Sequence, residues 1–326
     1  MKKSLLRIML GILSVLIVVI AGSLLYVSFG LPNVDDAPDI VIESSPERLS
    51  RGAYLVNHVA ICMDCHSERD WSLFSGPLKP GTQGMGGELF DENLGLPGRY
   101  YASNITPAGI GDWTDGEVFR AITSGVNRDG NALFPLMPYP NYGQMDDEDI
   151  YSVIAYLRTL EPIEHEVPKS VSNFPMNLII KTLPAKPAFQ KMPEKGNTLE
   201  YGKYLVNAAG CKSCHTPFAK GEYNEDLLFA GSREFPMPQG GLLKSANITF
   251  HEKTGIGTWT KERFVERFKS MDSSLVSIAN QPDSFNTIMP WSLYSGMEED
   301  DLEAIYEYLK SVKPVENQVV LFQASN

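Results

Sequence analysis

The sequence has few cysteines, few histidines and a shortage of basic residues. Among 326 residues there are 4 Cys and 5 His, and 28 Lys and Arg stand against 40 Asp and Glu, for a formal net charge of −12. Such an acidic balance argues against nucleic acid and anionic lipid surfaces as partners. A phosphate-binding glycine loop, an activated serine and a paired-carboxylate site are also missing. The sequence therefore offers no pattern for substrate chemistry of its own.

All four cysteines lie in two copies of one short motif. These are Cys62-Met-Asp-Cys65-His66 and Cys211-Lys-Ser-Cys214-His215, each a C-x-x-C-H. This is the attachment signature of c-type haem. Two thiols three residues apart on one helical turn can form thioethers to a single porphyrin, and the following histidine then supplies an axial ligand to the iron. The motifs predict two covalently bound haem c groups.

Other uses of such cysteines are a disulfide, half of a zinc site or a thioredoxin-like redox motif. A zinc site would require the two distant pairs to come together. A redox motif would not need a histidine after the second cysteine in both copies. With every cysteine used by a haem motif, a thiol mechanism is excluded.

The only long apolar run is at the N-terminus. Lys2, Lys3 and Arg7 precede an uncharged stretch, residues 8–31, of 24 residues. As a helix it would measure about 36 Å, which is enough to span a bilayer with some tilt. A cleavage site at residues 21–23 is the alternative, but the apolar run continues beyond it. We expect an uncleaved signal-anchor over residues 1–34, with the basic end in the cytoplasm and the rest outside the inner membrane.

The remainder of the chain contains an internal repeat. Five segments recur in the same order: 52–57 with 202–207, 104–106 with 247–249, 109–114 with 255–260, 137–139 with 289–291, and 155–158 with 307–310. Five ordered matches indicate a duplicated unit. We predict two domains, residues 45–161 and 198–315, joined by a proline-rich connector, residues 162–197. Apolar residues near the middle of the connector predict that it packs on a domain.

Each repeat is expected to be mostly helical. Ser45-Pro46 is a helix-start signal. Apolar positions at i, i+3, i+4 and i+7 predict a final helix in each repeat, and the acidic runs at residues 146–149 and 298–301 lie at its N-terminal end. Gly52 and Gly202 would let the first and last helices of each repeat cross closely, opposite Tyr156 and Tyr308.

A second axial ligand is expected from methionine. Met137 follows His66 by 71 residues and Met289 follows His215 by 74, and each precedes a proline at the same position of the repeat. Thioether ligation would close the coordination sphere of each iron and raise its potential. Met145 and Met297 are repeat-matched rivals, but their place at the start of the final helices favours packing.

Other residue pairs have two interpretations each. Trp113 and Trp259 could donate an N–H to a haem propionate or serve as core aromatics. Asn104 and Asn247 lie in N-x-T sequons, and their place in the repeat favours a role in a haem loop over glycosylation. The remaining histidines have no partner in the other repeat and are expected at the surface or behind the ligands: His58, His165 and His251.

Taken together, the repeated segments resemble the cytochrome c subunits of bacterial membrane-bound alcohol and gluconate dehydrogenases, over about residues 45–315. The resemblance implies an all-α fold of two class I-like cytochrome c domains behind a transmembrane helix. It implies axial pairs of His66 with Met137 and His215 with Met289. Those subunits typically carry three haems, whereas this chain has two attachment motifs.

The expected function is electron transfer, without catalysis. A periplasmic dehydrogenase would be the donor, and an oxidase or another cytochrome of the respiratory chain the acceptor. The alternative is a dihaem cytochrome c peroxidase, which needs one open iron and unlike ligands in its two halves. The equivalent Met-Pro pairs disfavour it. Oxidation of a sulfur compound at one haem has no supporting motif.

Overall fold

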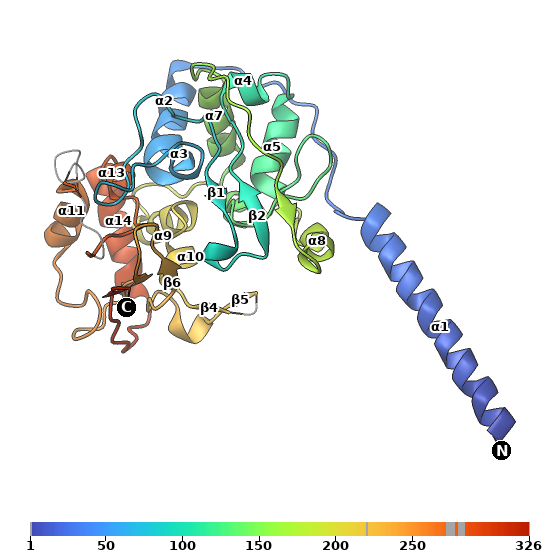
Figure 1. Cartoon of the computed structure of the whole chain (residues 1–326). Helices are drawn as coiled ribbons and strands as arrows, with labels where there is room; N and C mark the ends of the chain where they lie inside the picture. Colours follow the sequence, from blue (N-terminus) through green and yellow to red (C-terminus); the bar gives the residue numbers. More distant parts are fainter. Residues whose placement is uncertain (1, 220, 272–277, 280–283, 326) are drawn as a thin grey trace.

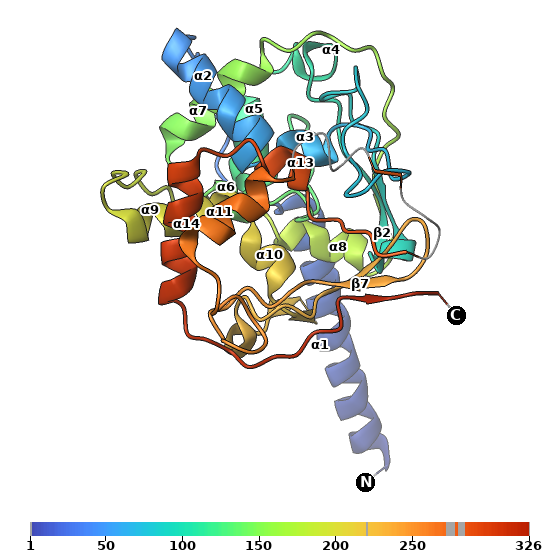
Figure 2. The same cartoon turned by 90° about the vertical axis from the view of Figure 1, so that its left-hand side faces the viewer.

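The protein is described by a computed structural model covering residues 2–219, 221–271, 278–279 and 284–325. Helix α1 (Lys2–Phe29) projects away from the remainder of the chain, as Figures 1 and 2 show. Within the described residues it is the one helix long and apolar enough to cross a membrane, and no part of it is buried. It includes most of the apolar run and ends at Phe29.

The body consists of a first half, residues 45–197, and a second half, residues 198–325, lying side by side (Figure 1). The helices of the first half are α2 (Pro46–Tyr54), continued by a π-helical turn (Leu55–Val59), α3 (Cys62–Cys65), α4 (Pro107–Ile110), α5 (Asp115–Ser124), α6 (Tyr139–Tyr142), α7 (Asp147–Leu157) and α8 (Met176–Ile179). Those of the second half are α9 (Thr198–Ala208), α10 (Cys211–His215), α11 (Lys261–Lys269), α13 (Trp291–Tyr294) and α14 (Glu299–Ser311). Short 3-10 turns occupy Glu92–Leu94, Ile180–Thr182 and Glu225–Leu227.

Local sequence signals explain where the main helices begin. The side chain of Ser45 accepts a hydrogen bond from the Arg48 N–H, and Pro46 occupies the first turn of α2. Asp146 caps α7 in the same way through the Glu148 N–H. Acidic residues fill the first turns of α7 and α14, where the helix dipole favours negative charge.

The first and last helices of each half cross at a glycine, as the sequence predicts. A Cβ on Gly52 would lie 1.9 Å from the Ser152 carbonyl oxygen, and one on Gly202 would lie 2.0 Å from that of Ala304. The Cβ atoms of Tyr156 and Tyr308 are the next neighbours. The apolar stripe of α7 and that of α14 are buried at these crossings: Ile150, Val153, Ile154, Leu157, Leu302, Ile305, Tyr306 and Leu309.

The expectation of a purely helical fold is wrong. Strands β1 (Leu89–Phe90), β2 (Gly98–Tyr101) and β3 (Val171–Ser172) form an antiparallel sheet in the first half, and β6 (Glu234–Pro236), β7 (Leu242–Lys244) and β8 (Phe322–Gln323) form one in the second. A small hairpin joins β4 (Phe218–Ala219) to β5 (Glu222–Tyr223). These strands have two to four residues, too few for an alternating pattern to show in the sequence.

The connector contributes to the first half. β3 lies within residues 162–197 and pairs with β2, just as β8 follows the last helix of the second half and pairs with β7. Further along, the Ala188 N–H donates to the Gly143 carbonyl at 2.7 Å. The connector therefore packs along the first half.

Reciprocal hydrogen bonds join the two halves. The Tyr54 hydroxyl lies 2.7 Å from Asp301 Oδ2, and the Tyr204 hydroxyl lies 2.6 Å from Asp149 Oδ2. Tyr54 and Tyr204 are equivalent in the repeat, as are Asp149 and Asp301. The same residue of each half therefore reaches the N-terminal turn of the other half's last helix, which relates the halves by approximate two-fold symmetry.

Candidate haem sites

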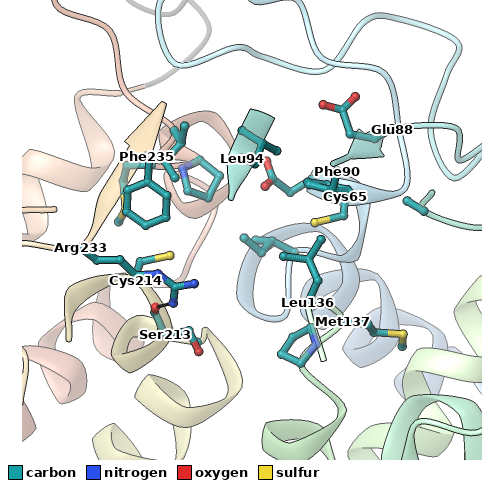
Figure 3. A pocket seen from close by; sticks show the side chains of 18 of the residues that line it. Cys65, Glu88, Phe90, Leu94, Leu136, Met137, Ser213, Cys214, Arg233 and Phe235 are labelled. Carbon is teal, nitrogen blue, oxygen red and sulfur yellow. Dashed lines mark hydrogen bonds between the residues drawn. The ribbon is translucent and has the colours of Figure 1, made fainter. Parts of the chain in front are cut away.

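Both C-x-x-C-H motifs face one large cavity between the halves. Its volume is about 3130 Å³, and most of its lining is apolar. Figure 3 shows Cys65 and Met137 on one side and Cys214 with Arg233 on the other. All eight residues proposed from the sequence line it: Cys62, Cys65, His66, Met137, Cys211, Cys214, His215 and Met289.

Each motif begins after a residue in the left-handed region. Gly210 precedes α10 with φ of 66°, and Ile61 precedes α3 with φ of 46°. Glycine adopts this conformation freely, whereas a β-branched residue does so only under strain. The turn that follows places two cysteines, at i and i+3, on one face of a helix. The same backbone geometry in both halves thus presents a pair of thiols to the cavity.

The four thiols are free, which disfavours a disulfide. No cluster of three or more His, Cys, Asp or Glu side chains suited to a metal ion occurs among the described residues, so zinc is not favoured either. Burial raises the pKa of Cys62 and of Cys211 to about 12. These residues are therefore neutral thiols before any covalent attachment.

The two motif histidines are held identically by backbone carbonyls. His66 Nδ1 lies 2.7 Å from the Ser103 oxygen, and His215 Nδ1 lies 2.8 Å from the Ala246 oxygen. A carbonyl can only accept, so Nδ1 carries the proton and Nε2 is left as a lone-pair donor. Burial lowers the pKa of both imidazoles, which favours the neutral form. A neutral imidazole with a fixed tautomer is what an iron ligand requires.

The Asn-Ile-Thr segments shape the loops that carry those carbonyls. Asn104 Oδ1 accepts from the Thr106 N–H at 3.0 Å, and its Nδ2 donates to the Ile163 oxygen at 2.8 Å. Asn247 repeats this with Thr249 and Val315, at 2.9 Å each. Both asparagines are buried and directly follow the carbonyl that binds the histidine. They have a structural place beside the site, and burial argues against glycosylation.

Two glycines of these sites were missed by the sequence analysis. The Gly86 N–H donates to the His66 carbonyl at 2.9 Å, and the Gly231 N–H donates to that of His215 at 2.8 Å. Both have positive φ, and a Cβ on either would fall within 2.5 Å of the histidine-binding loop. Unequal insertions after the two motifs conceal this match, since Gly86 lies 20 residues after its histidine and Gly231 lies 16 after its own.

Met137 and Met289 are half-buried and line the cavity. Tyrosines five residues after each methionine hold these segments against the motifs: Tyr142 donates to the Ala60 carbonyl at 2.9 Å, and Tyr294 donates to that of Ala209 at 2.6 Å. The methionine segment of each half is thereby fixed beside its own cysteine pair.

Four other methionines form two pairs with different positions. Met145 and Met297 are each 1% exposed and lie in the hydrophobic core, away from the cavity. Met85 and Met237 line the cavity without a counterpart in the other half. No motif or repeat match in the sequence marks this second pair.

Of the remaining aromatic and histidine candidates, some line the cavity and others lie away from it. Trp113 and Trp259 both line the cavity and pack against the core. His165 also lines the cavity. His58 Nδ1 lies 2.8 Å from the Leu293 oxygen at the junction of the halves, and His251 Nδ1 lies 2.8 Å from the Thr254 hydroxyl.

The residues at each site fit a c-type haem. In each half, two free thiols, a neutral imidazole with its Nε2 available and a thioether line the shared cavity. This donor set matches covalent attachment with histidine and methionine ligands. The same arrangement occurs in both halves, with the same hydrogen bonds.

Comparison with known proteins also points to cytochrome c. Residues 199–313 match the family model for cytochrome c. The chain is 28% identical to the gluconate 2-dehydrogenase cytochrome c subunit of Pantoea cypripedii, over 96% of this chain and 65% of that protein. It is 29% identical to the fructose dehydrogenase cytochrome subunit of Gluconobacter japonicus, over 81% of this chain and 52% of that protein. The chain thus spans about half to two thirds of the length of these two relatives.

A relative of similar length is also found. A dihaem cytochrome c-type protein of Cereibacter sphaeroides is 27% identical over 78% of this chain and 83% of its own. Residues 199–313 are therefore a cytochrome c domain, which implies covalently bound haem c, within a chain whose relatives are cytochrome c subunits of dehydrogenases and a dihaem cytochrome c.

Proposed function

We propose that this protein is a membrane-anchored dihaem cytochrome c that carries electrons from a periplasmic dehydrogenase toward the respiratory chain. The observation that carries the proposal is the repeated site. In each half the C-x-x-C-H histidine is held by a backbone carbonyl. A methionine lines the same cavity, and a tyrosine five residues later holds its segment beside the cysteines. Two like sites favour electron transfer over a peroxidase, whose halves should differ.

The proposed axial ligands are His66 with Met137 and His215 with Met289. Haem supplies one-electron redox chemistry, and the protein supplies ligands, orientation and a dry surrounding. The carbonyls of Ser103 and Ala246 orient the imidazoles of His66 and His215, and the lining of the cavity around them is mostly apolar. Two closed coordination spheres would leave no open position for a substrate.

In domain terms, we propose cytochrome c domains at residues 45–161 and 198–315. The segments after each last helix, including the connector 162–197, add the third strand of each sheet. Helix α1 would anchor the chain in the inner membrane, with Lys2, Lys3 and Arg7 in the cytoplasm and the haem domains outside.

The ligand assignment can be tested by spectroscopy of the purified full chain. Haem content should be two per chain, and the oxidised protein should show the near-infrared sulfur-to-iron band. Met137→Ala and Met289→Ala should each remove part of this band, and the double variant all of it. Met85→Leu is a matched control, because Met85 lines the cavity but is not a proposed ligand. A full band in both single variants would rule out the assignment.

The donor and acceptor can be tested by affinity purification of the protein from its own membranes, followed by mass spectrometry. A co-purifying dehydrogenase would support the proposed donor. Reduction of the haems by that dehydrogenase with its substrate, and their reoxidation by membranes, would establish the direction. Peroxide turnover together with a high-spin haem would instead support the peroxidase alternative.

A further inference from the structure

The two sites differ in charge at a position that the fold makes equivalent. The Gly86 and Gly231 N–H groups bind the carbonyls of the two motif histidines, and two residues later come Glu88 and Arg233. The carbonyls of Glu88 and Arg233 also accept equivalent backbone hydrogen bonds. The Ala102 N–H donates to the Glu88 oxygen at 3.0 Å, and the Ser245 N–H donates to the Arg233 oxygen at 2.9 Å. A carboxylate in the first half therefore stands where the second half has a guanidinium.

Both side chains lie at the cavity rather than at the outer surface. Each is half-buried and lines the cavity, and Figure 3 shows them on opposite sides of it. Arg233 donates to the carbonyl of Ser213, between the two cysteines of α10, and its guanidinium lies 5.5 Å from the centre of the Phe235 ring. A partly desolvated charge in such a place acts over a longer range than one in water.

Other charges close to the first motif do not cancel this difference. Arg69 and Asp64 form a buried ion pair at 3.1 Å, which is neutral as a unit. Among the described residues that line the cavity, the first half contributes five acidic and three basic side chains, and the second half contributes two acidic and four basic ones. The lining is therefore −2 on one side and +2 on the other. Haem carboxylates would add equally to both halves.

Charge of this kind sets the relative ease of reduction. A ferric haem gains one electron on reduction, so a nearby positive charge stabilises the reduced form and a negative charge stabilises the oxidised form. As a general scale, a unit charge roughly 10 Å away, at an effective dielectric constant of about 20, changes an equilibrium by roughly tenfold. The sign of the difference between the two potentials does not depend on the ionisation of Glu88. If Glu88 is neutral, the second site still has the positive charge of Arg233, and the first site has no charge at the equivalent position.

We infer that Glu88 and Arg233 order the two haems, with the first-half site (His66 and Met137) at the lower potential and the second-half site (His215 and Met289) at the higher. An electron then passes from the first site to the second, one site being oxidised as the other is reduced, with no atom transferred. The inference rests on the proposed function, since it requires two haems with like ligands. Because the ligands are alike, the surrounding charges are left to set the direction.

The test is a spectroelectrochemical redox titration of the full-length dihaem protein. Two components are expected, separated by at least tenfold in reduction equilibrium, or about 59 mV for a one-electron couple. They can be assigned with Met137→Ala, in which the component that keeps its potential belongs to the second half. That component should be the higher one. A lower potential for the second-half haem would overturn the inference.

Substitutions then test the two residues. Arg233→Gln should lower the potential of the second-half haem alone, and Arg233→Lys, which keeps the charge, should leave it near the wild-type value. Glu88→Gln should raise the potential of the first-half haem alone. Lys203→Gln is the control, because Lys203 is exposed on α9 and its charge lies outside the cavity lining. It should move neither potential.

The results separate this inference from the proposed function. Two haems with intact sulfur-to-iron bands, but with unchanged potentials in Glu88→Gln and Arg233→Gln, would refute the ordering and leave the ligand assignment standing. Haem content and the near-infrared band also show that each variant has folded. A protein with one haem, or without methionine ligation, would instead contradict the proposed function itself.

Discussion

The close helix crossing at Gly202 leads to a prediction about stability. A Cβ at this position would lie 2.0 Å from the Ala304 carbonyl oxygen, 2.6 Å from its carbonyl carbon and 3.0 Å from Tyr308 Cβ. An ordinary carbon-to-oxygen contact is about 3.3 Å or longer. In Gly202→Ala the new Cβ would therefore lie roughly 1.3 Å too close to the Ala304 oxygen. Two of the three neighbours are backbone atoms, which cannot rotate away. Helices α9 and α14 would have to separate.

The cost can be estimated from overpacking in other cores, which is typically about 1–3 kcal/mol and occasionally more. Because the new Cβ would meet the backbone of α14, Gly202→Ala should lower the free energy of unfolding by about 3 kcal/mol or more. The higher helix propensity of alanine would offset only about 1 kcal/mol. Since α9 leads into the motif at Cys211, the haem environment of the second half should be disturbed as well.

Denaturant unfolding of the holoprotein, followed by far-ultraviolet circular dichroism and by the sulfur-to-iron band, measures this effect. Gly196→Ala is the control: a Cβ there would meet nothing within 4 Å, and the change should be neutral or stabilise by up to about 1 kcal/mol. If Gly202→Ala and Gly196→Ala unfold at the same denaturant concentration, with equal slopes, the close crossing does not exist in solution.

Three further perturbations test other parts of the structure. Asn247→Ala should destabilise the second half by about 2–4 kcal/mol, because it leaves buried partners of its amide unpaired. A lowered thermal midpoint and a perturbed Soret band are expected. An unchanged spectrum would argue that Asn247 does not support the His215-binding loop. Tyr204→Phe removes the 2.6 Å hydrogen bond to Asp149 between the halves and should cost about 1.5–3 kcal/mol in unfolding free energy; a wild-type midpoint would show that this contact is not formed. Replacement of residues 1–34 by a cleavable export signal should release a dihaem protein from salt-washed membranes into the periplasmic fraction, whereas retention in the membrane would refute α1 as the anchor.

Much of the chemistry could be predicted from residue identity and spacing. The two attachment motifs, the repeated Met-Pro positions and the buried faces of α7 and α14 depend on local or periodic patterns. The crossings at Gly52 and Gly202 also followed from the repeat, and the structure confirms them. Met145 and Met297 are in the core, as their place at the start of a helix indicated.

Other features could not be predicted because the groups involved have no sequence signature. The acceptors for His66 and His215 are backbone carbonyls, which every residue possesses. The strands are short and pair with distant segments, as β2 does with β3 from the connector. A pairing of this kind is decided by how the helices pack and not by local preference.

The sequence by itself determined the two attachment motifs, the side chains that could ligate iron and the duplication of the unit, because covalent and coordination chemistry require particular side chains at fixed spacings. Only the tertiary structure decided that both sites open on one cavity and that Glu88 and Arg233 occupy matching places beside them. The insertions between motif and strand differ in length, so these two residues align only once the histidine-binding loops have folded. The difference in charge between the sites is thus a product of the fold.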